Sequence, residues 1–226
     1  MRYLFLDTET DGLPNKREQP HLVSLTWCIV RPDGIVEKME NHIIRPDGFF
    51  ISHEVTKIHG IFHNDALQFG KPCKEVLQRL VRDISFLKEV TIVGHNVKFD
   101  LDILKAELAR HQIFLDFGHL SVICTMRTTT PYCKLPKRRG KGFKWPTLQE
   151  LHFFLFGYNF GIAHSSKADV EATNRCFFEL KRRAFYKIDE TKHRESSNKK
   201  TASELPSNSV NCPPVVLEKY KIERIK

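Results

Sequence analysis

The amino terminus carries an apolar run that leads directly into two carboxylates separated by one residue. The run at 3–6, Tyr-Leu-Phe-Leu, is followed by Asp7 and Glu9. Such a continuous apolar run is typical of a strand buried on both faces. Because strand side chains alternate, the two carboxylates share a face, roughly 6–7 Å apart. The pair predicts a site for a divalent cation, although a strand that simply ends in acidic turn residues is the alternative reading of this pair alone.

Length and composition favour one globular domain. A chain of 226 residues, 41% hydrophobic and 28% charged, can bury a substantial core. No stretch approaches the roughly 20 apolar residues of a membrane span, and Asp7 comes too early for a signal peptide. We therefore expect an intracellular, cytoplasmic protein without a membrane partner.

The cysteine pattern indicates reduced thiols in a reducing compartment. There is no Cys-x-x-Cys pair and no histidine pair at zinc-finger spacing near a cysteine. Several cysteines stand in apolar runs, so we expect them to be small core residues. The six are Cys28, Cys73, Cys124, Cys133, Cys176 and Cys212.

The net charge favours a polyanionic partner. The formal charge is +9 and the isoelectric point is about 9.3, which attracts phosphates and releases counterions on binding. Part of the charge lies in the segment 134–145, where aromatic residues are interleaved and no acid is present. We expect this segment to track phosphates and stack on bases, with a solvated basic loop as the alternative. The candidate contacts are Lys137, Arg138, Arg139, Lys141, Lys144 and Trp145.

The order of predicted elements indicates an α/β fold. Three strands with a turn at 32–34 form an antiparallel meander, after which strands alternate with helices, so a mixed sheet flanked by helices is expected. Short helical signals occupy 47–71, whereas 131–146 breaks the pattern. The predicted strands cover 3–6, 22–30, 35–44, 90–93 and 120–124. The predicted helices cover 76–87, 101–109, 148–156 and the stretch from Ser165 or Ser166 to about 180.

The carboxyl-terminal part changes in composition. We expect an ordered domain over 1–186, a disordered linker over 187–209 that is poor in large apolar residues, and a tail over 210–226. The tail regains apolar residues, so it either contacts a partner such as a polymerase or is disordered.

Further chemistry-bearing residues stand at the ends of predicted elements. Asp100 follows a short buried strand where a helix starts, and Asp169 lies in the first turn of another helix, shortly after His164. Taken singly, each acid is more often a helix-start residue and the histidine more often a surface residue. Their combination is more informative.

These residues belong to three motifs that follow one another along the chain. They are Asp-Thr-Glu-Thr-Asp-Gly at 7–12, Gly-His-Asn-Val-Lys-Phe-Asp at 94–100, and His-Ser-Ser-Lys-Ala-Asp at 164–169. Lesser matches occur at 58–61 and 146–148. Over residues 3–185 the chain resembles the DEDDh (DnaQ-like) family of 3′→5′ exonucleases, which includes the proofreading exonuclease subunit of bacterial replicative DNA polymerase. The resemblance implies a ribonuclease-H-like mixed β-sheet flanked by α-helices.

The resemblance also implies a two-metal phosphodiester hydrolase acting from the 3′ end of DNA and releasing nucleoside 5′-monophosphates. Two divalent cations, Mg²⁺ or Mn²⁺, would be held by Asp7, Glu9, Asp100 and Asp169, while His164 deprotonates the attacking water. Carboxylates suit these hard cations, and the lack of a Cys/His set argues against zinc. The residues expected around the terminal nucleotide are Thr8, Thr10, Gly12, Leu13, His59, Asn96 and Phe99, with core packing as the alternative for Phe99.

Three functions are consistent with the sequence. The first is an exodeoxyribonuclease, either free-standing or proofreading in trans, because the chain is too short to include a polymerase. The second is an exoribonuclease acting on RNA ends or oligoribonucleotides, since nothing in the sequence reads the 2′-hydroxyl decisively. The third is a catalytically inactive nucleic-acid-binding module, which the presence of every expected metal ligand argues against.

Overall fold

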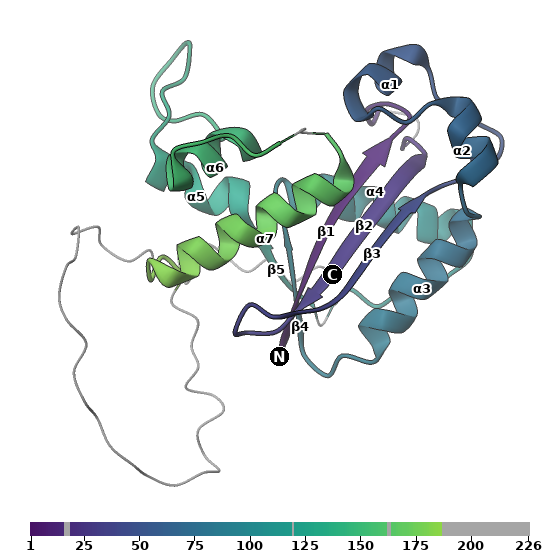
Figure 1. Ribbon diagram of the computed structural model, residues 1–226, viewed down its shortest axis with the longest axis horizontal. Coiled ribbons are helices and arrows are strands. Elements are labelled where there is room, and N and C mark those ends of the chain that lie inside the picture. The colour runs from purple at the N-terminus through teal and green to yellow at the C-terminus, as the bar shows by residue number, and fades with distance from the viewer. Residues whose placement is uncertain (16–18, 119, 162–163, 187–226) are drawn as a thin grey trace, which may run out of the picture.

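The computed structural model describes residues 1–15, 19–118, 120–161 and 164–186. The predicted linker at 187–209 and tail at 210–226 lie outside the described residues. The described residues contain five strands in one sheet, in the order β3-β2-β1-β4-β5 (Figure 1). The strands are β1 (Arg2–Thr10), β2 (Leu22–Val30), β3 (Val36–Ile43), β4 (Val90–Gly94) and β5 (Ser121–Cys124).

The predicted antiparallel meander is confirmed. β1 pairs antiparallel with β2, and β2 with β3, whereas β4 runs parallel to β1 and β5 parallel to β4. The apolar run at 3–6 is buried, as expected. Asp7 and Glu9 lie within β1 rather than beyond its end, because Asp7 to Thr10 continue to pair with β2. Backbone pairing therefore fixes the positions on β1 from which both carboxylates project.

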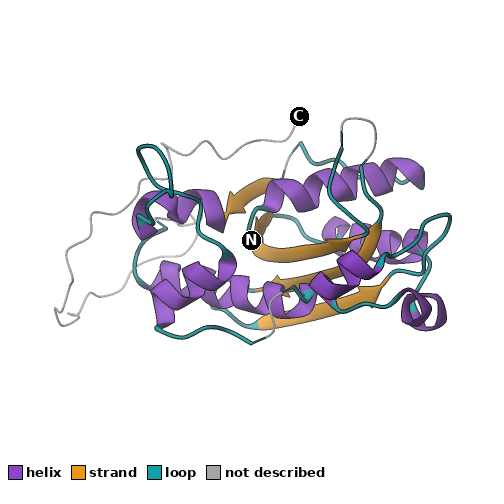
Figure 2. Cartoon of the chain, turned by 90° about the horizontal axis from the view of Figure 1, so that it is seen from above, coloured by secondary structure: helices purple, strands orange, loops and turns teal. Residues whose placement is uncertain are grey.

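Helices cover both faces of the sheet, so the strands form a middle layer (Figure 2). One face packs against α3 (Cys73–Ser85) and α4 (Val97–Arg110). The opposite face packs against α5 (Thr125–Cys133), α6 (Leu148–Phe156) and α7 (Ser166–Arg182). The short helices α1 (His53–His59) and α2 (His63–Phe69) follow β3. Among the described helices, none has the length and apolar character needed to cross a membrane.

The alternation of β1 divides the interior into two cores. Leu4 and Leu6 face the core beneath α3 and α4, whereas Tyr3 and Phe5 face the core beneath α7. Phe177 of α7 is fully buried there, with its ring centroid 4.8 Å from that of Tyr3 and 5.5 Å from that of Phe5. Asp7 and Glu9 follow on the same side as Tyr3 and Phe5, so α7 packs on the face that carries the carboxylates.

The predicted helices are confirmed, with shifted ends for α3 and α4. α4 begins at Val97, four residues before the predicted start, and places Asp100 in its first turn. α6 begins at the predicted position with a capping box between Thr147 and Glu150.

Helix α5 was not predicted, and the expectation that 131–146 is irregular is wrong for 131–133. Its sequence is rich in threonine and contains Pro131. Threonine and proline are both poor helix formers. Tertiary packing stabilises it, because Thr125, Met126 and Thr129 are buried. In addition, Thr129 donates its hydroxyl to the Thr125 carbonyl at 2.7 Å.

All cysteines in the described residues are free thiols. Cys28, Cys133 and Cys176 are buried in the core beneath α7, as expected for small apolar residues. Cys73, the first residue of α3, and Cys124, the last residue of β5, differ, because both are only partly buried.

Candidate active site

Three carboxylates converge at the carboxyl end of β1. One oxygen each from Asp7, Glu9 and Asp169 lies within 4.8 Å of the other two. The packing of α7 explains this convergence. Asp169 precedes the core residue Phe177 by eight residues, or roughly 12 Å of helix. Glu9 follows Phe5 by roughly 13 Å of strand. A helix that runs antiparallel to β1 and packs Phe177 near Phe5 therefore also places Asp169 near Glu9.

The start of α7 is tied to the sheet through hydroxyl groups. The Ser166 hydroxyl lies 2.8 Å from that of Thr26 and 2.9 Å from that of Ser24, both on β2. Ser165, one of the two serines expected at the start of this helix, occupies the N-cap position, but its side chain makes no capping hydrogen bond. These contacts position the first turn of α7, which carries Asp169.

Asp100 reaches the same region from the opposite helical layer. It is 3% exposed, and its Oδ1 accepts hydrogen bonds from the Thr8 N–H at 2.9 Å and the Thr8 hydroxyl at 2.8 Å. Asp100 is therefore beside the cluster but oriented by Thr8, and it is not among the three carboxylates whose oxygens lie within 4.8 Å of one another.

The turn before α4 is unusually tight. A Cβ added to Gly94 would lie 2.8 Å from the Cβ of Val97, and Asn96 has a left-handed φ of 67°, so this turn requires glycine at 94. His95 fixes the turn by donating from Nε2 to the Pro146 carbonyl at 2.9 Å. Burial lowers the pKa of His95 to about 4, so the ring is neutral. This positioning role of His95 was not predicted.

The electrostatics of the cluster favour cation binding. Burial and repulsion from the neighbouring carboxylates raise the pKa of Asp7 well above its usual range and that of Glu9 to about 8. Burial raises the pKa of Asp100 to about 7 against the opposing hydrogen bonds from Thr8. Burial also raises the pKa of Asp169. A divalent cation would relieve this repulsion and favour the ionised carboxylates.

An oxygen of Asp169 supports the same conclusion. Its Oδ2 accepts a hydrogen bond from the His164 N–H at 3.2 Å, but its Oδ1 is buried without a hydrogen-bond partner. A buried oxygen in this state is costly unless a ligand satisfies it. The oxygen donors therefore fit a hard cation such as Mg²⁺ or Mn²⁺.

His164 lies just before α7 with its side chain exposed. Its backbone has a left-handed φ of 65°, and its N–H reaches Asp169. The backbone contact thus keeps the histidine next to one of the converging carboxylates.

The residues predicted around the terminal nucleotide are in varied environments. Thr8 holds Asp100, and the Thr10 hydroxyl donates to the Gly12 carbonyl at 2.6 Å. Leu13 is 82% exposed beyond β1.

The others come from α1 and α4. His59 is buried in α1, where its Nδ1 accepts from the Ile61 N–H at 3.0 Å and its Nε2 has no hydrogen-bond partner. Asn96 is exposed at the start of α4. Phe99 is partly buried and packs against the core beneath α4.

The basic segment 134–145 forms a hairpin-like loop. Pro136 and Phe143 form an antiparallel bridge. The exposed side chains at its tip are Lys137, Arg138, Arg139 and Lys141, and Trp145 is 61% exposed. Lys144 forms an ion pair with Glu150, so its charge is already engaged within the protein.

A second cluster was missed. Atoms of Cys73, Glu107 and His111 lie within 4.8 Å of one another. The four-residue spacing of Glu107 and His111 on a helix was the available signal. Cys73 is too distant in sequence to have been included.

Relatives in sequence are much longer than this chain. No family model matches it. The chain is similar to the PolC-type DNA polymerase III of Streptococcus thermophilus, at 28% identity over 224 residues. That match covers 99% of this chain and 13% of the relative. The protein of the same description from Streptococcus mutans is 27% identical over 178 residues, covering 78% of this chain and 11% of the relative.

The structural comparison identifies the fold. A structure of exonuclease I matches with a TM-score of 0.66 at 20% sequence identity, covering 80% of this chain and 41% of that chain. E. coli exonuclease I in complex with a dT13 oligonucleotide matches with a TM-score of 0.66 at 19% identity, covering 80% of this chain and 41% of that chain. The fold is ribonuclease-H-like. The predicted fold class is thereby confirmed.

In this ribonuclease-H-like sheet, two parallel strands end at the site. β1 carries Asp7 and Glu9 near its carboxyl end, and the parallel strand β4 ends at Gly94, where the tight turn leads to Asp100. The carboxyl ends of adjacent parallel strands are common places for ligand sites in α/β proteins.

Proposed function

We propose that this chain is a metal-dependent 3′→5′ exodeoxyribonuclease of the DEDDh type that releases nucleoside 5′-monophosphates, with residues 1–186 as its exonuclease domain. The observation that carries the proposal is the convergence of Asp7, Glu9 and Asp169, with Asp169 Oδ1 buried and unpartnered. Such a cluster is costly for folding but suited to holding cations against a phosphate.

Asp7, Glu9, Asp100 and Asp169 would hold two divalent cations, Mg²⁺ or Mn²⁺. When bound, the cations supply charge neutralisation at the phosphodiester and at its departing 3′ oxygen. The chain itself supplies rigidity. β1 fixes two carboxylates, Thr8 orients Asp100, and the Ser166 contacts to β2 fix the helix that carries Asp169.

His164 would act as the general base for the attacking water. Its side chain is exposed, and its backbone N–H donates a hydrogen bond to Asp169. An imidazole is the side chain best suited to accept a proton near neutral pH. This role, and attack from the 3′ end, rest on the motif resemblance.

DNA is the proposed substrate. The likeness to PolC-type DNA polymerase III supports a DNA substrate and a replication context, either free-standing or in trans. The structural neighbours include E. coli exonuclease I complexes with single-stranded DNA. The exposed loop with Lys137, Arg138, Arg139, Lys141 and Trp145 would contact the strand through phosphate attraction and stacking.

The deciding experiment uses 5′-labelled single-stranded DNA, RNA of matched sequence, and circular single-stranded DNA, each with Mg²⁺ or Mn²⁺. We expect a ladder shortening stepwise from the 3′ end of DNA, intact circles, and no products with EDTA. Asp7→Asn should abolish the ladder, whereas Asp65→Asn, which changes an exposed acid on α2, should preserve it.

The products distinguish the alternatives. Immediate release of a labelled mononucleotide would indicate the opposite polarity, and cut circles would indicate an endonuclease. Faster shortening of RNA would assign the exoribonuclease alternative. Binding of either strand without cleavage would contradict the enzymatic proposal and favour a binding module.

A further inference from the structure

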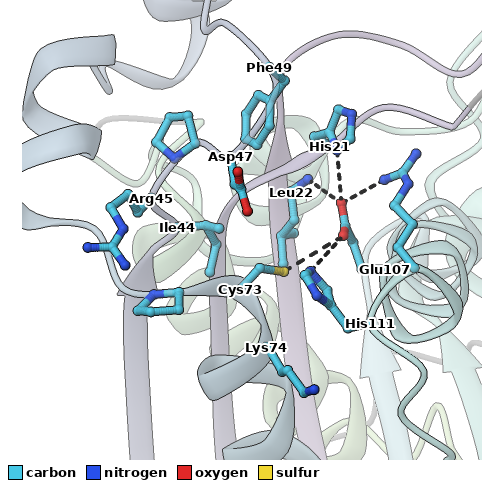
Figure 3. Close-up of a pocket in the computed structure, with 13 residues that line it drawn as sticks. His21, Leu22, Ile44, Arg45, Asp47, Phe49, Cys73, Lys74, Glu107 and His111 are labelled. Atoms are coloured by element: carbon cyan, nitrogen blue, oxygen red, sulfur yellow. Dashed lines mark hydrogen bonds and ion pairs between the residues drawn. The ribbon is translucent and has the colours of Figure 1, made fainter.

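Glu107 is a buried acid on the face of the sheet opposite Asp7 and Glu9. It lies in the last turn of α4 and is 3% exposed (Figure 3). One of its oxygens, Oε1, accepts hydrogen bonds from the Leu22 N–H at 3.0 Å and from Arg110 at 2.7 Å. His21 Nδ1 is 3.7 Å from the same oxygen. These contacts fix the orientation of the carboxylate.

The other oxygen, Oε2, faces a thiol and an imidazole. The Cys73 thiol donates a hydrogen bond to Oε2 at 3.7 Å, and His111 Nε2 lies 3.7 Å from the same oxygen (Figure 3). The histidine distance is too long for a hydrogen bond. In a tetrahedral zinc site, however, bond lengths of about 2.0–2.3 Å place neighbouring ligand atoms roughly 3.3–3.6 Å apart. The two separations from Oε2 lie within a few tenths of an ångström of that geometry, and ligand atoms of Cys73 and His111 lie within 4.8 Å of each other.

The three side chains come from well-fixed backbone. Cys73 is the first residue of α3, and Glu107 and His111 stand four residues apart on α4 and at its carboxyl end. Helical neighbours at this spacing share one face. All three line a pocket of about 610 Å³, so water can supply a fourth ligand.

We propose that Cys73, Glu107 and His111 bind a zinc-class divalent cation. A thiolate, an imidazole and a carboxylate together favour zinc or a similar transition metal over magnesium. The site is distinct from the oxygen-only cluster at Asp7, Glu9 and Asp169. Its role is a cross-link between the start of α3 and the end of α4, which stabilises the fold by binding the native state.

Cobalt is the best probe, because Co²⁺ bound to a thiolate gives a charge-transfer band in the near ultraviolet. The carboxylate cluster has no thiolate ligand, so it gives no such band. We expect metal-free wild-type protein to develop the band with one equivalent of Co²⁺ and to lose it when Zn²⁺ is added. Zn²⁺ should also raise the thermal unfolding temperature.

Variants assign the ligands. Cys73→Ser should abolish the band. His111→Ala should weaken Co²⁺ affinity by well over about tenfold, since even groups that only orient metal ligands contribute roughly 10- to 100-fold. Cys124→Ser and His53→Ala, which change a cysteine and a histidine outside the pocket, should leave the band unchanged.

A measurement on the wild-type protein alone keeps the proposal falsifiable if Cys73→Ser does not fold. Zn²⁺ should protect Cys73 from alkylation by iodoacetamide, as mapped by mass spectrometry. Absence of the cobalt band from folded wild-type protein, a band that survives Cys73→Ser, or alkylation of Cys73 unchanged by Zn²⁺ would each overturn the proposal.

Discussion

Thr8 donates two hydrogen bonds to the same oxygen of Asp100, one from its backbone N–H at 2.9 Å and one from its hydroxyl at 2.8 Å. Thr8 stands between Asp7 and Glu9 in β1, whereas Asp100 lies in the first turn of α4. This double contact joins the helix to the strand that carries the other carboxylates. It also limits the rise in the pKa of Asp100 that burial causes.

Replacing Thr8 by valine should therefore impair the proposed exonuclease activity by acting through Asp100. The change removes the hydroxyl donor while keeping the side-chain shape, so the pKa of Asp100 should rise above about 7. We expect kcat/KM at pH 7 to fall by about tenfold or more and the acidic limb of the pH–rate profile to shift upward. Thr8→Ser should restore most of the activity. An unchanged profile in the valine variant would contradict this role of Thr8.

Asp169→Asn should raise the stability of the metal-free protein and lower its activity. Removing one charge from the crowded cluster relieves repulsion, so the metal-free variant should unfold at a higher temperature than the wild type at pH 8. The proposed exonuclease activity should fall by at least about 100-fold, because a proposed cation ligand is lost. Thermal unfolding in EDTA and single-turnover cleavage measure the two effects, and Asp65→Asn is the control. Lower stability together with full activity would refute the assignment.

The stability of the metal-free protein should fall as pH rises from 7 to about 8.5. The pKa of Glu9 is raised from 4.5 to about 8, so the folded state keeps a proton that the unfolded chain has lost. The resulting stabilisation is fully present below pH 4.5 and is lost as pH rises through 8. The pKa of Asp100, about 7, acts in the same direction.

Urea unfolding in EDTA across this range measures the effect. The buried His95 has a lowered pKa, so its contribution makes stability rise with pH at lower pH. Measurements above pH 6.5 largely exclude this opposing contribution. Saturating Mg²⁺ should flatten the slope, because the ionised carboxylates then bind the cation, and Glu9→Gln should reduce it. A slope independent of both Mg²⁺ and Glu9 would show that other groups cause it.

The exposed basic loop should determine affinity rather than the chemical step. Arg138→Ala/Arg139→Ala should raise KM for single-stranded DNA with little change in kcat. Each lost phosphate contact should lower the slope of log affinity against log salt by about 0.7. Titrations at several salt concentrations measure this slope. The control Lys57→Ala/Lys88→Ala removes two exposed charges from other parts of the fold, and equal effects from both pairs would indicate only a general charge effect.

Much of the fold could be predicted because its signals are local. The apolar run at 3–6 predicted the central strand, and the meander, α6 and α7 followed from turn residues, caps and helical periodicity. α5 could not be predicted in this way. Its threonines and Pro131 disfavour a helix, and packing of buried side chains from distant segments overcomes that preference.

Some features of the candidate site could likewise be predicted from local sequence, whereas others depend on tertiary packing. By itself, the sequence determined which carboxylates carry the motifs and that Asp7 and Glu9 share a strand face, because strand alternation is a local property. Only the tertiary structure decided that α7 brings Asp169 to this pair, that Thr8 orients Asp100, and that Lys144 is paired with Glu150. It also decided that Cys73 meets Glu107 and His111. These contacts join residues far apart in the chain, and their distances depend on the packing of whole helices against the sheet.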